Sequence, residues 1–263
     1  MMGEDILSRI VRDKRVEVQA AKERRPEKLL IEQAMSTSNR RPFADRLAVP
    51  GPHGVNIIAE IKRASPSKGI IRADLDPAQY ARKYTAGGAA ALSVLTDEKY
   101  FKGNADDLAQ ARRSTLIPVL RKDFIVSAFQ IYESCVIGAD AVLLIVRILS
   151  EQQLRDYLAL CGEVGIDALV EVHSEKEFDI AALAGACLIG VNNRDLDTFK
   201  TDIMTCIRLA GRFEPQHIGV AESGIRNRAD IEKITAAGIH NFLIGESLVR
   251  ADNTEGFLEN LIG

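Results

Sequence analysis

The chain has 263 residues, of which 46% are hydrophobic and 27% are charged, a composition typical of a globular protein with a sizeable core. Its formal net charge of -3 gives no reason to expect a nucleic-acid partner. Charged residues interrupt the N-terminal stretch, and no apolar run approaches the ~20 residues of a membrane helix, so we expect neither a signal peptide nor a membrane span. The cysteines are widely scattered, so we expect neither a disulfide framework nor a metal site. A cytoplasmic protein fits these features best.

The N-terminal part of the chain predicts helices and then a connector. Leu7, Ile10 and Val18 recur on one side of a first helix, and Pro26 begins a second, shorter one. The prolines and glycine up to Pro52 are typical of a connector. We expect residues 1–54 to form an N-terminal helical extension and connector that pack on the rest of the chain.

Short apolar runs then alternate with helix-like segments. Most of the runs lack polar alternation, as expected for parallel strands covered by helices. The predicted strands are Val55–Ile61, Ala90–Leu95, Ile117–Leu120, Ala141–Val146, Ala168–Val172, Leu188–Val191, Ile218–Ala221 and Phe242–Ile244. Between them, Pro77–Ala86 illustrates the helices, with Asp76 as N-cap and proline at the first helical position.

Eight strands that alternate with helices predict a (β/α)8 TIM barrel, a fold that usually takes ~250 residues. We expect residues 55–263 to form this barrel and residues 1–263 to form a single domain. An open doubly wound sheet is the alternative, although the first strand lacks the Gly-x-Gly-x-x-Gly pattern that often accompanies it.

Polar residues follow the predicted strands at the end where such barrels carry their active sites. Glu60 and Lys62 point to the same side of the first strand, and Ser65–Gly69 then predicts a mobile, basic loop. Lys62 and Lys122 come from alternate strands and are expected to converge, so that each ammonium lowers the pKa of the other and favours proton donation. Glu60 and Glu171 would hold this pair or act as a base; an ion-pair network without chemistry is the alternative.

Small residues end the last two predicted strands and favour a phosphate site. Ser223-Gly224 and Gly245-Glu246 allow backbone N–H groups to approach a dianion, with a helix N-terminus behind them. Glu246 is expected to contribute only its backbone, because its carboxylate would repel phosphate. The alternative is that these glycines only permit tight turns.

Taken together, these motifs resemble the indole-3-glycerol-phosphate synthase family of tryptophan biosynthesis. The resemblance rests on Glu60-Ile61-Lys62-Arg63-Ala64-Ser65-Pro66-Ser67-Lys68-Gly69, Arg121-Lys122-Asp123-Phe124, Glu171-Val172-His173, Asn192-Asn193-Arg194-Asp195-Leu196, Glu222-Ser223-Gly224 and Gly245-Glu246-Ser247, which occur in this order over nearly the whole chain. It implies ring closure, decarboxylation and dehydration of 1-(2-carboxyphenylamino)-1-deoxyribulose 5-phosphate to indole-3-glycerol phosphate, with no metal or organic cofactor.

The resemblance also implies roles for individual residues. Lys122 would be the general acid that protonates the ketose carbonyl oxygen, and Glu171 the general base of the dehydration. Lys62, oriented by Glu60, would pair with the substrate, Asn192 would hydrogen-bond sugar oxygens, and Ser65 and Arg194 would contact polar substrate groups. An apolar ring pocket is implied for Phe101, Phe124, Leu143 and Leu196. Backbone phosphate binding is implied for Ser223, Gly224, Gly245 and Glu246.

Two other functions stay open at this point. One is a Schiff-base aldolase on the same fold with Lys122 as nucleophile, and the other is a non-catalytic phosphosugar-binding barrel. All three readings expect a small phosphosugar ligand, no membrane, and either a monomer or a weak homo-oligomer.

Overall fold

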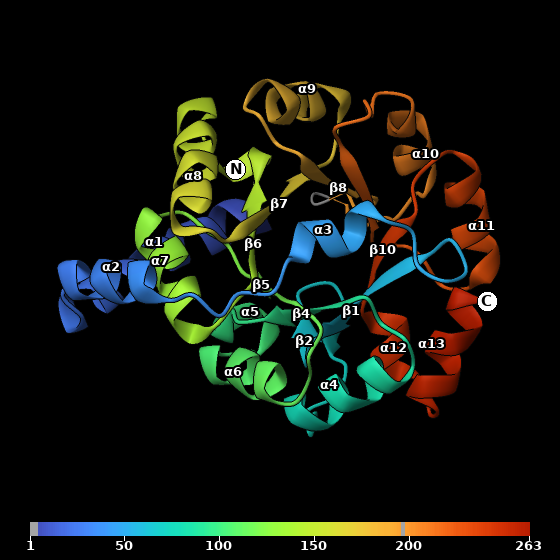
Figure 1. Cartoon of the computed structure of the whole chain (residues 1–263), viewed down its shortest axis with the longest axis horizontal. Helices are drawn as coiled ribbons and strands as arrows, with labels where there is room; N and C mark the ends of the chain where they lie inside the picture. Colours follow the sequence, from blue (N-terminus) through green and yellow to red (C-terminus); the bar gives the residue numbers. More distant parts are fainter. Residues whose placement is uncertain (1–4, 196–197) are drawn as a thin grey trace.

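The computed structural model describes residues 5–195 and 198–263 of the chain. Within these ranges, eight parallel strands close into a barrel in the order β1-β10-β9-β8-β7-β6-β5-β4 (Figure 1). The strands are β1 (Asn56–Ile61), β4 (Ala91–Leu95), β5 (Val119–Lys122), β6 (Ala141–Ile145), β7 (Asp167–Val172), β8 (Leu188–Asn192), β9 (Ile218–Glu222) and β10 (Asn241–Ile244). The predicted (β/α)8 barrel is confirmed.

Helices follow the strands and surround the barrel. They are α4 (Pro77–Ala86), α5 (Glu98–Phe101), α6 (Ala105–Arg113), α7 (Ala128–Ile137), α8 (Glu151–Val164), α9 (Glu175–Leu183), α10 (Met204–Ala210), α11 (Arg228–Ala236), α12 (Glu246–Arg250) and α13 (Thr254–Ile262), with a short 3-10 turn at Val146–Ile148. Side-chain caps fix where several of them begin: Asp76 accepts the N–H groups of Ala78 and Gln79, as the sequence predicts. Among the described helices, none combines the length and apolarity needed to cross a membrane.

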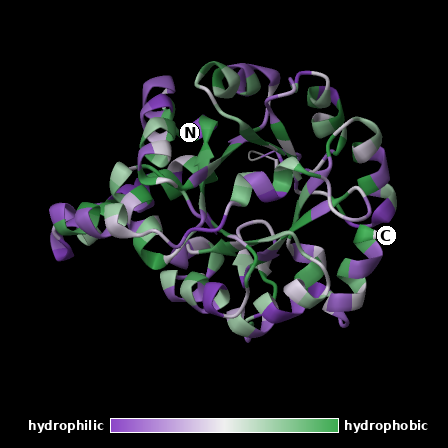
Figure 2. Cartoon of the chain, in the orientation of Figure 1, coloured by the Kyte–Doolittle hydropathy of each residue, from purple (hydrophilic) through white to green (hydrophobic). Residues whose placement is uncertain are grey.

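The alternation of side chains along the strands separates two apolar layers. Ile58, Leu120, Leu143 and Leu169 point into the barrel and form one buried cluster. Their neighbours along the strands point outward and form a larger cluster with the inner faces of the helices. Figure 2 shows the result, with apolar strands inside and polar outer faces on the surrounding helices.

The N-terminal extension packs against both ends of the barrel. It consists of α1 (Ile6–Arg24), α2 (Glu27–Ser36) and α3 (Phe43–Ala48), so the prediction of a plain connector before the first strand is wrong. In Figure 1, α3 lies across the middle of the barrel. Phe43 and Leu47 enter the interior cluster, and the Asp167 carboxylate accepts the N–H groups of Phe43 and Ala44 at 2.9 Å. This helix therefore closes the end opposite the carboxyl ends of the strands.

Two further local predictions need correction. The third barrel strand was predicted at Ile117–Leu120 but extends to Lys122 in β5, so Lys122 is part of the strand. The segment after β1 is not a plain loop, because β2 (Ala64–Ser65) and β3 (Gly69–Ile70) pair as a short antiparallel hairpin. This hairpin folds back near the carboxyl ends of the strands.

Candidate active site

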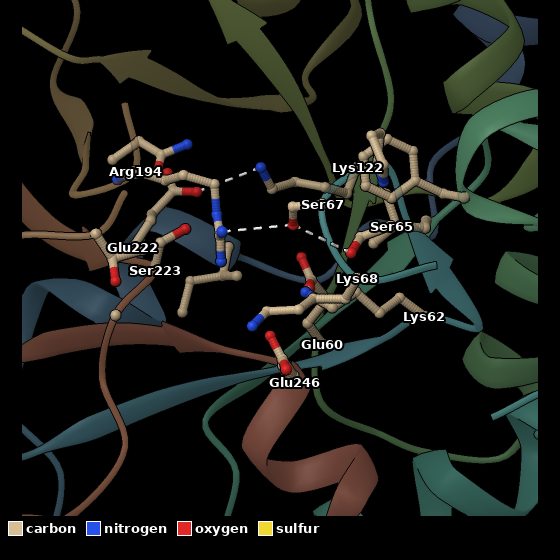
Figure 3. Close-up of a pocket in the computed structure, with 18 of the residues that line it drawn as sticks. Glu60, Lys62, Ser65, Ser67, Lys68, Lys122, Arg194, Glu222, Ser223 and Glu246 are labelled. Atoms are coloured by element: carbon tan, nitrogen blue, oxygen red, sulfur yellow. Dashed lines mark hydrogen bonds and ion pairs between the residues drawn. The ribbon is translucent and has the colours of Figure 1, made fainter. Parts of the chain in front are cut away.

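A cavity of about 1050 Å³ opens at the carboxyl ends of the barrel strands. Its lining brings together Glu60, Lys62, Ser65, Phe101, Lys122, Phe124, Leu143, Glu171, Asn192, Arg194, Ser223, Gly224, Gly245 and Glu246, which are the site residues that the sequence predicts. Leu196, predicted for the ring pocket, lies outside the described residues. Figure 3 shows the labelled members of this set around a common space, on different strands and on the segments that follow them.

Alternate strands of the barrel supply a charged layer at the floor of the cavity. Lys122 of β5 places its Nζ 2.9 Å from Glu171 Oε2 of β7 and 3.3 Å from Glu222 Oε2 of β9. Lys62 instead pairs with Glu60 of β1, with 2.5 Å between Nζ and Oε1. Side chains from alternate strands fill the same layer of such a barrel, which explains why residues so distant in sequence meet here.

The charge state of Lys122 differs from the sequence prediction. Burial opposes the charged form, but the carboxylates of Glu171, Glu222 and Glu60 outweigh it and raise the pKa of Lys122 well above its ordinary value. The prediction that Lys62 and Lys122 lower each other's pKa is therefore wrong for Lys122. The surrounding carboxylates therefore favour the ammonium form of Lys122.

Glu222 is the main site residue to which sequence reasoning gave no role. Its carboxylate is buried and its Oε1 has no hydrogen-bond partner among the described residues. The signal was available, because Ile218 and Val220 already point into the barrel and the alternation continues to Glu222. A buried oxygen without a partner in a cavity wall is free to bind a ligand.

The two carboxylates beside Lys122 titrate in opposite directions. Burial opposes ionisation of Glu171, but Lys122 and His173 outweigh it and lower its pKa well below the usual range. Burial, together with the neighbouring charge of Glu171, raises the pKa of Glu222 to about 7. The pair therefore holds one carboxylate ionised and a second one that exchanges a proton near neutral pH.

This raised pKa predicts a pH-dependent stability. The native state keeps the Glu222 proton at pH values where the unfolded chain has lost it, so this group's stabilising contribution is complete at acidic pH and declines as the pH rises toward 7. Relative to Glu222→Gln, the wild type should lose about 1 kcal/mol of unfolding free energy per pH unit between about pH 5 and 7. Urea unfolding of both proteins at several pH values measures this. Glu163→Gln, at an exposed glutamate, controls for the substitution itself, and parallel curves for the wild type and Glu222→Gln would contradict the assignment.

His173 supports Glu171 from behind the cavity. Its Nε2 lies 3.4 Å from Glu171 Oε1, and its Nδ1 lies 3.1 Å from Glu177 Oε2. Burial lowers the pKa of His173, but the two carboxylates outweigh it and raise the value above the ordinary one. The imidazole does not line the cavity, so it acts on Glu171 and not on a ligand.

Polar side chains from the β2–β3 hairpin and the loop after β8 meet across the cavity. Arg194 NH1 lies 3.4 Å from Ser67 Oγ, which in turn lies 3.4 Å from Ser65 Oγ (Figure 3). Asn192 Oδ1 accepts the backbone N–H of Arg194 at 3.0 Å, which orients the start of this loop. These groups form a polar rim opposite the charged layer.

One wall of the cavity is apolar. The rings of Phe101 and Phe124 lie side by side with centroids 6.1 Å apart and planes tilted by 42°, and Leu143 also lines the cavity. The first turns of α1 complete the wall with Leu7 and Ile10, which the sequence placed only in helix packing. A flat aromatic group fits this combination of rings and aliphatic side chains.

The turns after β9 and β10 form the opposite wall. Ser223 and Gly224 adopt φ values of 65° and 79°, and the left-handed conformation of a non-glycine residue is a strain typical of functional sites. Gly245 packs against the Glu60 side chain so closely that a Cβ would overlap it. The Glu246 carboxylate pairs with Arg250 Nε at 3.2 Å, one turn further along α12.

The site contains no obvious metal centre. In residues 5–195 and 198–263, no three His, Cys, Asp or Glu side chains come together as metal ligands. The arrangement is instead that of proton-transfer groups between an apolar wall and a pair of backbone turns.

Comparison with known proteins relates this site to one family. The chain is 58% identical to the indole-3-glycerol phosphate synthase of Desulfosudis oleivorans and 55% identical to that of Syntrophobacter fumaroxidans, with 98% of each chain covered in both comparisons. A solved thiamine phosphate pyrophosphorylase from Pyrococcus furiosus matches 82% of this chain and 95% of its own, with a TM-score of 0.58 and 15% identity, which shows the shared fold alone. The family model for indole-3-glycerol phosphate synthase matches residues 7–261. The chain therefore belongs to the indole-3-glycerol phosphate synthase family.

Proposed function

We propose that the chain closes the indole ring of 1-(2-carboxyphenylamino)-1-deoxyribulose 5-phosphate, giving indole-3-glycerol phosphate, carbon dioxide and water. The observation that carries the proposal is the position of the Lys122–Glu171–Glu222 cluster between an aromatic wall and the turns after β9 and β10. The match to the family over nearly the whole chain supports the same reaction. We further propose that it takes place in the cytoplasm, without a nucleic-acid partner.

In the first step, the Lys122 ammonium donates a proton to the ketose carbonyl oxygen of the bound substrate. This makes the carbonyl carbon electrophilic, and the ring carbon that bears the carboxylate attacks it and forms the new carbon–carbon bond. Loss of carbon dioxide returns the electron pair to the ring. The apolar wall of Phe101 and Phe124 keeps water from the ring and favours decarboxylation.

In the second step, the hydroxyl that was the carbonyl oxygen leaves as water. Glu171, held ionised beside Lys122, takes the proton from the anilino nitrogen; the electron pair released expels the hydroxyl, which receives a proton from the cluster and leaves as water. The CH2 carbon beside the nitrogen then gives a proton back to the cluster and Glu171 returns its proton to the nitrogen, which completes the indole. Glu222 is suited to this exchange because its pKa lies near neutral pH. Asn192, the register partner of Glu222 on the neighbouring strand, also lines the cavity and is suited to hydrogen-bond the sugar oxygens.

The ends of the substrate bind at opposite walls. The backbone of Ser223, Gly224, Gly245 and Glu246 receives the phosphate, and the pairing of Glu246 with Arg250 reduces repulsion by its carboxylate. Lys62, oriented by Glu60, pairs with the substrate carboxylate or phosphate. Ser65 and Arg194 on the polar rim hold the remaining polar groups.

A Schiff-base aldolase would need Lys122 as a neutral amine, and two adjacent carboxylates disfavour that form. The test is to incubate the purified protein with the anilino-deoxyribulose phosphate, follow indole fluorescence, and trap a second sample with borohydride. We expect fluorescent product and no covalent adduct. An adduct would support the aldolase, and ligand binding without product would support a non-catalytic barrel.

Gly190 provides a test of Glu222 that changes the chemical identity of no proton-transfer group. A Cβ at Gly190 of β8 would overlap the Glu222 carboxylate, so Gly190→Ala should displace this side chain from Lys122. We expect kcat to fall by roughly 10-fold or more, since displacement of a catalytic group by 1 Å costs rate steeply. Steady-state kinetics measure this, with Gly162→Ala as control, because a Cβ there meets no neighbouring atom. Unchanged kinetics for Gly190→Ala would mean that the position of Glu222 is unimportant.

A further inference from the structure

Lys14 is a buried charge that the proposed reaction does not use. It lies in the middle of α1 and exposes only 2% of its surface. Its Nζ lies 3.0 Å from Asp97 Oδ2, 3.0 Å from Asp123 Oδ1 and 2.8 Å from Glu17 Oε2. Burying a lysine costs free energy unless it is well paired, so its position between two buried carboxylates calls for an explanation.

Each of the two carboxylates organises a segment that carries an aromatic residue of the cavity. Asp97 Oδ1 accepts the N–H groups of Tyr100 at 2.7 Å and Phe101 at 3.3 Å, and so caps α5. Asp123, the residue after Lys122, accepts the N–H of Phe124 with its Oδ1 at 2.8 Å. One ammonium therefore connects the backbone turns that position both rings.

The same lysine fixes α1 as part of the cavity wall. Leu7 and Ile10 of α1 face the cavity, and Lys14 follows Ile10 by one helical turn. A second contact reinforces this docking, because Asp13 pairs with Lys99 of α5 at 2.7 Å and accepts a hydrogen bond from the Tyr100 hydroxyl. The apolar wall is thus assembled from three segments around Lys14.

We propose that Lys14 is a positioning residue for the aromatic end of the substrate. It joins α1, α5 and the turn after β5 into one wall, and it contacts neither the substrate nor the proton-transfer cluster. The inference rests on the proposed function, because it takes the aromatic ring of the substrate to be the group that this wall binds.

The proposal predicts a selective loss of binding. In Lys14→Met the ammonium is removed and the side-chain length is kept. Asp97 then loses its cationic partner and Asp123 keeps Arg121 alone, so the link between their two segments is broken and the wall loosens. The phosphate turns lie on other strands and do not change. Affinity for a ring-bearing ligand should therefore fall by about tenfold, while affinity for a phosphosugar without the ring stays the same.

Calorimetric titration can measure both affinities. The ring-bearing probe is the substrate reduced at its ketose carbonyl to an alcohol, and the ring-free probe is ribulose 5-phosphate. Lys22→Met is the matched control on the same helix. Lys22 is half-buried and its Nζ lies 3.7 Å from Glu27 Oε1, and it does not line the cavity. In the substrate assay, Lys14→Met should raise KM more than it lowers kcat, and Lys14→Arg should recover part of the loss.

Equal affinity of Lys14→Met and wild type for the ring-bearing probe overturns the proposal, and so does an equal loss for both probes, which would indicate a general structural weakening. If Lys14→Met does not fold, Asp13→Asn loosens the same wall without burying an unpaired charge. This variant should show a smaller loss of affinity that is again confined to the ring-bearing probe. Unchanged affinity of Asp13→Asn for that probe also overturns the proposal. A wild type that neither binds the ring-bearing probe nor turns over substrate would instead refute the proposed function and this inference together.

Discussion

Replacing Lys122 by Met should reduce kcat by about a thousandfold, because a general acid in such a step contributes 10²- to 10⁴-fold to the rate. Methionine keeps most of the side-chain volume and removes the proton that the carbonyl oxygen receives. The loss should include a second effect, since Glu171 and Glu222 then share the site without their common counter-charge. That lack of a counter-charge favours protonation of both carboxylates and removes the base needed for dehydration.

Indole fluorescence under single-turnover conditions measures the chemical step directly for this variant. Lys233→Met is the control, because Lys233 is an exposed lysine of α11 on the outside of the barrel. Circular dichroism establishes that both variants fold. A folded Lys122→Met protein with more than about a tenth of the wild-type rate would show that Lys122 is not the proton donor.

Glu171→Gln should lower kcat by about a hundredfold or more, with KM changed much less. Glutamine matches glutamate in shape and still accepts a hydrogen bond from Lys122, but it cannot take the anilino proton. Since Glu171 acts after ring closure, carbon dioxide release should be affected less than formation of the indole. The ratio of carbon dioxide to indole product in the first turnover measures this difference.

The control for this substitution is Glu163→Gln, an exposed change on α8. The prediction fails if Glu171→Gln slows carbon dioxide release and indole formation to the same extent. That result would place Glu171 in the first step, beside Lys122, and would leave Glu222 as the candidate base for dehydration.

The sequence was sufficient to predict the barrel, the end at which its cavity opens and a core set of charged and aromatic residues that line it. The apolar runs mark the strands, and period-2 alternation brings Glu60 and Glu171 to the inner face at the end where such barrels bind ligands. Glu222 obeys the same alternation, so its position on the inner face follows from the strand pattern as well. Local pattern alone therefore accounts for much of this site.

What the sequence did not predict depends on contacts between distant residues. Helix α3 forms in a proline-flanked segment because Asp167, far along the chain, accepts its first N–H groups. Lys14 shares the apolar face of α1 with Ile10 and Val18, and its charge there is explained only by Asp97 and Asp123 from distant segments. The raised pKa of Lys122 likewise depends on carboxylates from other strands.

The most direct test of the account is to count both products from a substrate labelled with carbon-13 in its carboxylate. The account predicts that the wild type releases one labelled carbon dioxide for each indole-3-glycerol phosphate formed. Lys122→Met should fold and bind the reduced substrate, but it should form both carbon dioxide and indole-3-glycerol phosphate far more slowly than the wild type. Binding of the substrate by the wild type without release of labelled carbon dioxide, or unimpaired release by Lys122→Met, would contradict it.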